Sequence, residues 1–240
     1  SYSGNYMIHT DSILYGPYEN SDTTLMWMII GYKSQYSPHV NQSELCATCH
    51  TLFTPTMDAQ GNIIGEFPEQ TPYIEWKNSV YPSQNIQCQD CHMPKIYDPI
   101  KISGMGNFPD RTPFWRHTFV GGNYYMQNLL KNNIDSLGLT ADPEHFDSTI
   151  ARTEYGLKEL SVELTTSASF SNDILEVKLY LKNLTGHKIP TGIPFRRMWI
   201  HLKVEQEIGN VVFESGQWDG TGKIINYNSD FEPHYDLIDS

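Results

Sequence analysis

Two short segments carry the residue types and the spacing that attach a cofactor covalently. The pattern Cys-x-x-Cys-His occurs at Cys46–His50 and again at Cys88–His92. In each pattern the two thiols can form thioether bonds with the vinyl groups of one haem, and the adjoining imidazole can bind the iron. The sequence therefore predicts two haem c groups, and the residues expected to hold them are Cys46, Cys49, His50, Cys88, Cys91 and His92.

Other chemistry of paired cysteines fits this pattern less well. A pair of disulfides would not require a histidine after each second cysteine. The Cys pairs of a zinc ribbon usually lie about 15–20 residues apart, whereas residues 50–87 separate these two. A Cys-x-x-Cys thiol redox site would normally occur once, at the start of a helix in a βαβ unit. Zinc and disulfide sites are kept as the alternatives to covalent haem.

Two haem irons need two further axial ligands, and the remaining histidines are the natural candidates. Loop positions in the half of the chain that carries the cysteine motifs are favoured, and so is a loop framed by Gly and Pro between two predicted strands. An aromatic neighbourhood, as in Phe114-Trp115-Arg116-His117, would suit a porphyrin. The candidate distal ligands are His9, His39, His117 and His187.

Methionine is the competing axial ligand, and Met/His ligation would raise the haem potential. Met57 and Met105 lie in predicted loops and stay open as alternatives. We expect ligation by two histidines, and hence lower potentials. His145 and His201 are expected to be structural, and His234 is left open.

The composition predicts an acidic protein without a membrane span. Acidic residues number 28 against 16 basic ones, which gives a net charge of −12. Nucleic acid and anionic membrane surfaces are therefore poor partners, and basic patches on redox proteins are better ones. No apolar run approaches the roughly 18 residues of a transmembrane helix. The first residues lack the basic and apolar regions of a signal peptide, so any such peptide has been removed or lies upstream.

Three stretches that differ in composition and in the period of their apolar residues together predict an α+β fold. Residues 1–120 are rich in Pro, Gly, Tyr, Asn and Ser, which predicts a loop-rich domain that folds around two haems. A short helix is expected at residues 71–79 with Pro72 in its first turn, and a loop is the alternative there.

Residues 121–160 predict a linking pair of helices. Apolar residues at helical spacing run from Met126 to Leu137, and Gly138 ends the run. The second helix begins with Asp142 as N-cap and Pro143 in the first helical position. The apolar stripes of both helices are interpreted as core packing.

Residues 161–240 switch to the period of two that is typical of strands. Apolar and polar residues alternate over 175–182 and again over 198–205. Gly209-Asn210 then predicts a hairpin turn before residues 211–214. Short antiparallel strands with turns between them predict a small β-sandwich domain.

Several segments resemble bacterial multihaem c-type cytochromes. They are the cysteine motifs with their flanks, at residues 43–52 and 88–94, and the segments 67–73, 114–117, 121–123, 186–192 and 196–197. The resemblance covers nearly the whole chain and is most specific at the cysteine motifs. It implies electron transfer in the periplasm or outside the cell, closely spaced bis-His haems and a C-terminal β-sandwich. It also supports His39 and His117 as distal ligands and adds weight to His187.

Members of that family usually carry further haem motifs upstream of the segment that matches residues 15–18. They also carry further strands after the segment that matches residues 232–236. The resemblance therefore implies a piece of a longer protein with a truncated sandwich. Some of the candidate histidines would then serve haems that are attached elsewhere.

Three functional classes follow from these observations. An electron carrier with both faces of each iron capped is favoured over an enzyme, because the histidines suffice to close both irons. A redox enzyme with one open haem, such as a reductase of nitrogen or sulfur oxyanions, is the first alternative. A structural subunit of a larger cytochrome complex or filament is the second, and the 15 tyrosines would suit its contacts. Expected partners are redox proteins or other cytochrome subunits outside the cytoplasm, where bacteria attach c-type haem.

Overall fold

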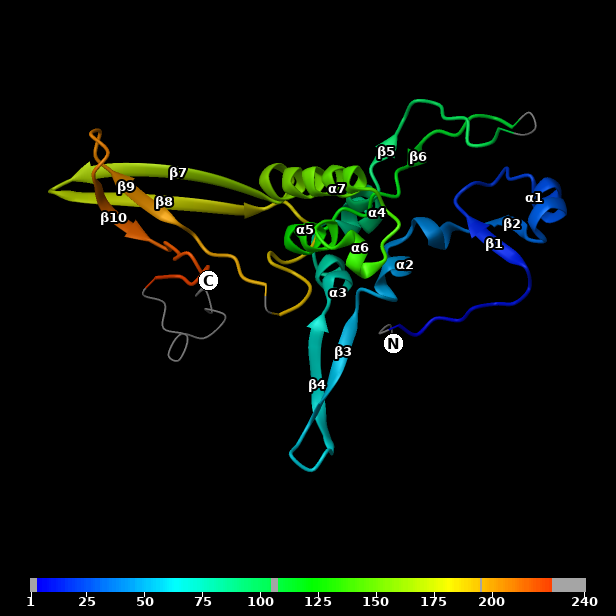
Figure 1. The fold of residues 1–240 in the computed structure, drawn as a ribbon, viewed down its shortest axis with the longest axis horizontal. Helices are drawn as coiled ribbons and strands as arrows, with labels where there is room; N and C mark the ends of the chain where they lie inside the picture. The colour runs from blue at the N-terminus through cyan, green and yellow to red at the C-terminus, as the bar shows by residue number, and fades with distance from the viewer. Residues whose placement is uncertain (1–3, 105–107, 195, 226–240) are drawn as a thin grey trace. The chain divides into compact units, whose positions relative to one another are not determined.

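The computed structural model describes residues 4–104, 108–194 and 196–225, which form a mixed α+β structure (Figure 1). The predicted fold class is therefore confirmed. The chain divides into two compact units, residues 1–194 and 195–240. From the sequence we expect domain boundaries at residues 120 and 160 instead, and those boundaries stay predictions. Within the described ranges, no helix has both the length and the apolar character needed to cross a bilayer.

The first unit contains more regular structure before residue 120 than the sequence predicts. Its helices there are α1 (Thr23–Ile30), α2 (Ser43–Ala47), α3 (Pro72–Lys77) and α4 (Cys88–His92), with 3-10 turns at η1 (Pro38–Asn41) and η2 (Pro82–Gln84). Parallel strands β1 (Ile13–Gly16) and β2 (Lys33–Tyr36) form one sheet; two antiparallel pairs are β3 (Leu52–Met57) with β4 (Ile63–Gln70), and β5 (Lys95–Ile96) with β6 (Phe114–Trp115). The helix expected at residues 71–79 is confirmed as α3, with Pro72 in its first turn.

The buried core of the first unit is small and lies on α2 and α3. Among the described residues, the buried apolar side chains are Ala47, Tyr73 and Trp76, which are 0%, 3% and 8% exposed. The rings of Tyr73 and Trp76 stack with centroids 5.6 Å apart. The indole Nε1 of Trp76 donates a hydrogen bond to the Ile86 carbonyl at 2.9 Å. This core fixes α3 beside α2, which carries the first cysteine of the first motif.

Replacing Trp76 with Ala is expected to lower the free energy of unfolding by about 3–5 kcal/mol, the usual cost of emptying a buried aromatic site. The matched control is Trp27→Ala, because Trp27 lies on α1 and is 47% exposed. That change should cost less than about 1 kcal/mol. Denaturant unfolding followed by circular dichroism measures both. Equal losses in the two variants would show that Trp76 does not anchor a core.

Helical structure after residue 120 follows the prediction except at one point. Helices α5 (Tyr124–Lys131) and α6 (Ile134–Leu137) replace the single run predicted from 126 to 137. The break lies at two consecutive asparagines, where Asn133 Nδ2 donates to the Leu129 carbonyl at 2.8 Å. Asparagine side chains compete with the backbone for such carbonyls and so weaken a helix interior. Gly138 ends α6 with φ 61°, as predicted.

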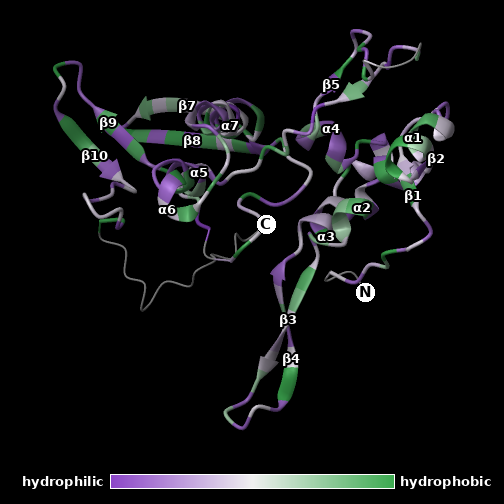
Figure 2. Ribbon diagram, turned by 45° about the vertical axis from the view of Figure 1, so that its right-hand side comes forward, coloured by the Kyte–Doolittle hydropathy of each residue, from purple (hydrophilic) through white to green (hydrophobic). Residues whose placement is uncertain are grey.

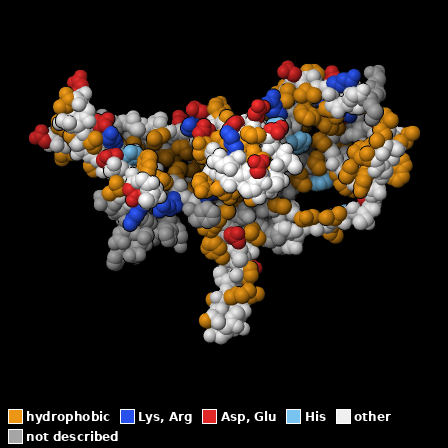
Figure 3. Space-filling view, in the orientation of Figure 1, with side chains coloured by type: hydrophobic (Ala, Val, Ile, Leu, Met, Phe, Trp, Pro, Cys, Tyr) orange, Lys and Arg blue, Asp and Glu red, His pale blue; other side chains and the backbone are white. Residues whose placement is uncertain are grey.

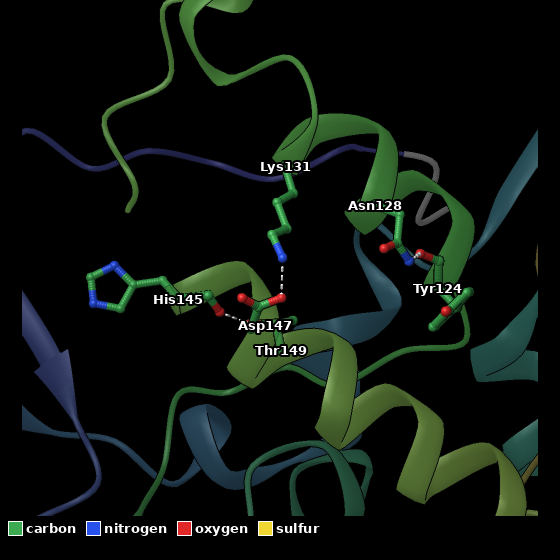
Figure 4. Close-up of polar contacts among 6 residues, drawn as sticks. All are labelled: Tyr124, Asn128, Lys131, His145, Asp147 and Thr149. Carbon is green, nitrogen blue, oxygen red and sulfur yellow. Dashed lines mark hydrogen bonds and ion pairs between the residues drawn. The ribbon is translucent and has the colours of Figure 1, made fainter. Parts of the chain in front are cut away.

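The second predicted helix is confirmed as α7 (Pro143–Tyr155), which continues as a short π-helical turn, η3 (Gly156–Leu160). Asp142 occupies the N-cap and Pro143 the first helical position. Lys131 at the end of α5 forms an ion pair with Asp147 in α7, which joins the two helices (Figure 4). Residues 121–160 are therefore helical, as predicted, with the first predicted helix divided into α5 and α6.

The strand predicted at residues 175–182 is confirmed as β8 (Ile174–Asn183), which pairs antiparallel with β7 (Val162–Ser171). Figure 2 shows hydrophobic and hydrophilic residues alternating along β8. Asn172 and Asp173 join the strands with φ values of 52° and 61°, the positive pair that a type I′ turn requires. The segment that follows β8 contains His187.

The second unit contains the hairpin of β9 (Leu202–Glu205) and β10 (Val211–Ser215). The turn predicted at Gly209-Asn210 is confirmed, with Gly209 at φ 87°. The strand predicted from residue 198 begins only at Leu202. The backbone of Gly216 passes close to the residues just before this strand, since an added Cβ there would lie 2.2 Å from the Ile200 carbonyl oxygen. Face-to-face packing of the two hairpins as a sandwich stays a prediction.

Candidate functional site

Helix α2, on which the first cysteine motif begins, contacts α4, which carries the second motif (Figure 1). Ser43, which is 0% exposed, donates from its backbone N and its Oγ to Gln87 Oε1 at 3.0 and 2.8 Å. The Cys88 amide in turn donates to Ser43 Oγ at 3.0 Å. Gln89 Nε2 donates to the Gln42 carbonyl at 2.8 Å. Side chains at or near the start of each helix thus bond to backbone groups at the start of the other.

The first cysteines of the two motifs share a hydrogen bond. The thiol of Cys46 donates to the sulfur of Cys88, and this bond raises the pKa of Cys46 and lowers that of Cys88 to about 7. Burial raises the pKa of Cys91. All four cysteines are free thiols, as cofactor attachment requires. The predicted attachment residues of the two motifs are therefore adjacent in space.

The histidines of the motifs are suited to bind iron as neutral imidazoles. His92 Nδ1 lies 2.6 Å from the Val120 carbonyl oxygen. A carbonyl can only accept, so Nδ1 carries the proton and the neutral ring keeps its lone pair on Nε2. Such an Nδ1–H bond is the usual orienting contact of a metal-binding histidine. Burial, with a further contribution from nearby His92, lowers the pKa of His50.

His187 is the distal candidate that the structure brings to a motif histidine. Its ring centre lies 6.3 Å from that of His92, and the two ring planes differ by 23°. His187 Nδ1 donates to the Lys188 carbonyl at 3.0 Å, so its Nε2 is also the free ring nitrogen. Burial lowers the pKa of His187 and favours the neutral, ligating form.

The separation of these two rings matches that of two ligands on one iron. A ring centre lies about 1.2 Å from Nε2, and a histidine nitrogen lies about 2 Å from a bound metal. Two imidazoles on opposite faces of one iron therefore have centres about 6.4 Å apart. The observed 6.3 Å between His92 and His187 fits this value. In the described ranges no group of three or more His, Cys, Asp or Glu side chains could hold a metal ion; a haem iron takes four ligands from its porphyrin and only two from the protein.

The loop that carries His187 is fixed at its base by polar contacts. Asn183 Oδ1 accepts from the Thr185 amide at 2.8 Å, and Asn183 Nδ2 donates to the His187 carbonyl at 2.7 Å. Tyr81 donates from its hydroxyl to the Leu184 carbonyl at 2.6 Å. Gly186 passes so close to the core that an added Cβ would lie 3.1 Å from a Trp76 ring carbon. The loop is therefore positioned by the same core that orders α3.

The other predicted distal ligands lie elsewhere on the first unit and are exposed. His39 Nδ1 lies 2.6 Å from Ser37 Oγ, and its ring meets Tyr15 edge-on. His117 packs against the rings of Phe114 and Phe119, and His9 lies in the segment before β1. Their roles as ligands stay predictions.

The remaining candidates can be placed in part. In the second unit, His201 has its Nε2 2.8 Å from Glu214 Oε1, so its usual iron-binding nitrogen is engaged by a carboxylate. Met57 is exposed at the end of β3. Met105 and His234 lie outside the described residues.

Many large hydrophobic side chains among the described residues are exposed. Hydrophobic side chains are accordingly visible over much of the surface (Figure 3). In the first unit they include Leu45 just before the first motif and Phe53 shortly after it, which are 47% and 36% exposed. Large flat apolar cofactors, held at the two motifs, fit such a chain.

Comparisons with known proteins give one distant likeness. No family model matches the sequence, and no curated protein matches it. Among solved structures, a penta-heme cytochrome c552 from Thermochromatium tepidum is similar, with a TM-score of 0.48 and 17% sequence identity. The similarity covers 85% of this chain and 43% of that protein, so the chain spans less than half the length of the similar structure.

Proposed function

We propose that this chain is part of a multihaem c-type cytochrome and carries electrons between redox partners through two covalently attached, closely spaced haems. The single observation that carries the proposal is the pair of His92 and His187, whose rings are separated as two axial ligands of one iron would be. It stands beside four free thiols in two adjacent Cys-x-x-Cys-His motifs. When bound, each haem would supply an iron that takes up and releases one electron reversibly.

In this proposal the residues of the chain hold the two haems and orient the histidines that bind the iron. Four thiols tether the two groups, and the contacts of Ser43 and Gln87 keep the two tethers side by side. The carbonyls of Val120 and Lys188 fix the tautomer and the orientation of the two imidazoles, which also makes both rings more basic ligands. His92 and His187 would together supply the two protein ligands of one iron, which favours a carrier over an enzyme that needs an open iron.

The same chemistry leads to proposals for the location of the protein and for its partners. We propose a location in the periplasm or outside the cell, because bacteria attach c-type haem there. The net charge of −12 favours redox partners with basic docking surfaces. Other cytochrome subunits are the second proposed class of partner.

Intact mass measurement under denaturing conditions tests the proposal. The purified protein should exceed its 27.5 kDa polypeptide mass by the mass of two haems. A spectroelectrochemical titration should then show reversible reduction of both, and the reduced protein should not bind carbon monoxide rapidly. A mass equal to that of the bare polypeptide would refute covalent haem. Rapid carbon monoxide binding would instead favour an enzyme with an open iron.

A further inference from the structure

Glu75 reaches from α3 to the loop that carries His187. One of its carboxylate oxygens, Oε2, accepts hydrogen bonds from the Lys188 amide at 2.9 Å and from the Thr191 hydroxyl at 2.6 Å. Thr71 at the start of α3 donates to the other oxygen at 3.4 Å. Two donors of the loop therefore converge on one side chain of a distant helix.

Lys188 connects this carboxylate to the imidazole of His187. The amide of Lys188 donates to Glu75, and its carbonyl accepts the Nδ1 proton of His187 at 3.0 Å. A residue bonded through both backbone groups cannot turn without breaking one of the two bonds. The direction in which His187 presents Nε2 therefore depends on Glu75 through one intervening residue.

The helix that carries Glu75 is suited to act as a fixed support. Its neighbours Tyr73 and Trp76 are the buried aromatic residues of the core. The loop itself is less well packed, because an open cleft of ≈ 450 Å³ lies between it and α3, lined by residues such as Ile74, Asn78 and Thr185. Polar contacts across this cleft, rather than close packing, therefore hold the outer part of the loop.

We propose that Glu75 is a positioning residue that holds His187 in place as an axial ligand and sets the reduction potential of that haem. This inference rests on the proposed function. Holding the ligand favours the six-coordinate, low-spin iron, because a loop that is already ordered loses less conformational freedom when its histidine binds. The negative charge stabilises the oxidised iron relative to the reduced one and so lowers the potential.

Two variants at this position separate the effect of charge from that of support. Glu75→Gln keeps an acceptor for the Lys188 amide but removes the charge, so the midpoint potential of one haem should shift to a more positive value with the low-spin spectrum retained. Glu75→Ala removes both, so part of the low-spin signal of that haem should be lost and should return with added imidazole. Glu66→Gln on the exposed face of β4 is the charge-matched control and should shift neither property.

Amide exchange provides a measurement that does not depend on the cofactor. The Lys188 amide should exchange slowly in the unaltered protein and at least tenfold faster in Glu75→Ala, which is the loss of protection expected when a hydrogen-bonded amide is released. Unchanged exchange, or an unchanged spectrum and potential in Glu75→Ala, would overturn the inference. If His187→Ala changes the spectrum but Glu75→Ala does not, the proposed function stands and only this inference fails. A protein without haem would refute the proposed function, while the exchange result would still decide whether Glu75 holds the loop.

Discussion

Replacing His187 with Ala is expected to convert one of the two haems from a low-spin, six-coordinate state to a high-spin, five-coordinate state. The reason is geometric, since His187 is the distal candidate whose ring the structure places near that of His92, with ring centres 6.3 Å apart. About half of the low-spin absorbance and electron paramagnetic resonance signal should be lost. The reduced variant should bind carbon monoxide at one iron, and added imidazole should restore the low-spin signal.

His201→Ala is the matched control for this experiment. The ring of His201 already has its Nε2 engaged by Glu214 in the second unit, so its removal should leave both spectra unchanged. If His187→Ala also leaves them unchanged, His187 is not an axial ligand. The same measurement on His39→Ala and His117→Ala would then show which of the other predicted histidines serves that iron.

The double substitution Cys88→Ser and Cys91→Ser is expected to remove one haem and a large part of the stability. Serine is close to cysteine in size, so the direct effect on packing is small and the loss arises from the missing cofactor. Burying apolar surface contributes about 25 cal/mol per Å² to stability. If the missing haem leaves roughly 200 Å² of protein surface uncovered, the loss is about 5 kcal/mol. That cost is comparable with the whole free energy of unfolding of an ordinary domain. Mass measurement under denaturing conditions counts the remaining haems, and denaturant unfolding measures the loss of stability.

The corresponding change in the first motif, Cys46→Ser with Cys49→Ser, makes the comparison specific. Each double variant should retain one haem, but only the protein that keeps the second motif should still respond to His187→Ala. That result would assign His187 to the haem held by Cys88 and Cys91. Retention of two haems by either variant would contradict covalent attachment at the altered motif.

The fold was predictable where the sequence has a clear period or a turn residue with a defined role. The alternation of apolar and polar residues gives β8, and Gly209-Asn210 gives the turn between β9 and β10. The break at Asn133 was not predictable from apolar spacing, because the apolar stripe continues across it while a side chain takes a backbone acceptor. Strands β3 and β4 were also missed, since both are largely exposed and carry no regular alternation.

The candidate site was predictable only in its local part. The cysteines and the adjoining histidines form a contiguous motif, so the sequence alone identifies them. The choice of His187 among four loop histidines depends on the β7–β8 hairpin and on the contacts of α3, which no local pattern encodes. Ser43, Gln87 and Glu75 were missed for the same reason, because each acts on a backbone group far away in the sequence.

The shared proton between Cys46 and Cys88 has a consequence for the order of events during biogenesis. The two side chains are within hydrogen-bond distance, and this bond lowers the pKa of Cys88. An oxidant that joined them before cofactor insertion would remove one sulfur from each tethering pair and so disable both at once. Haem attachment at both motifs, as proposed, would therefore require these two thiols to stay reduced until attachment.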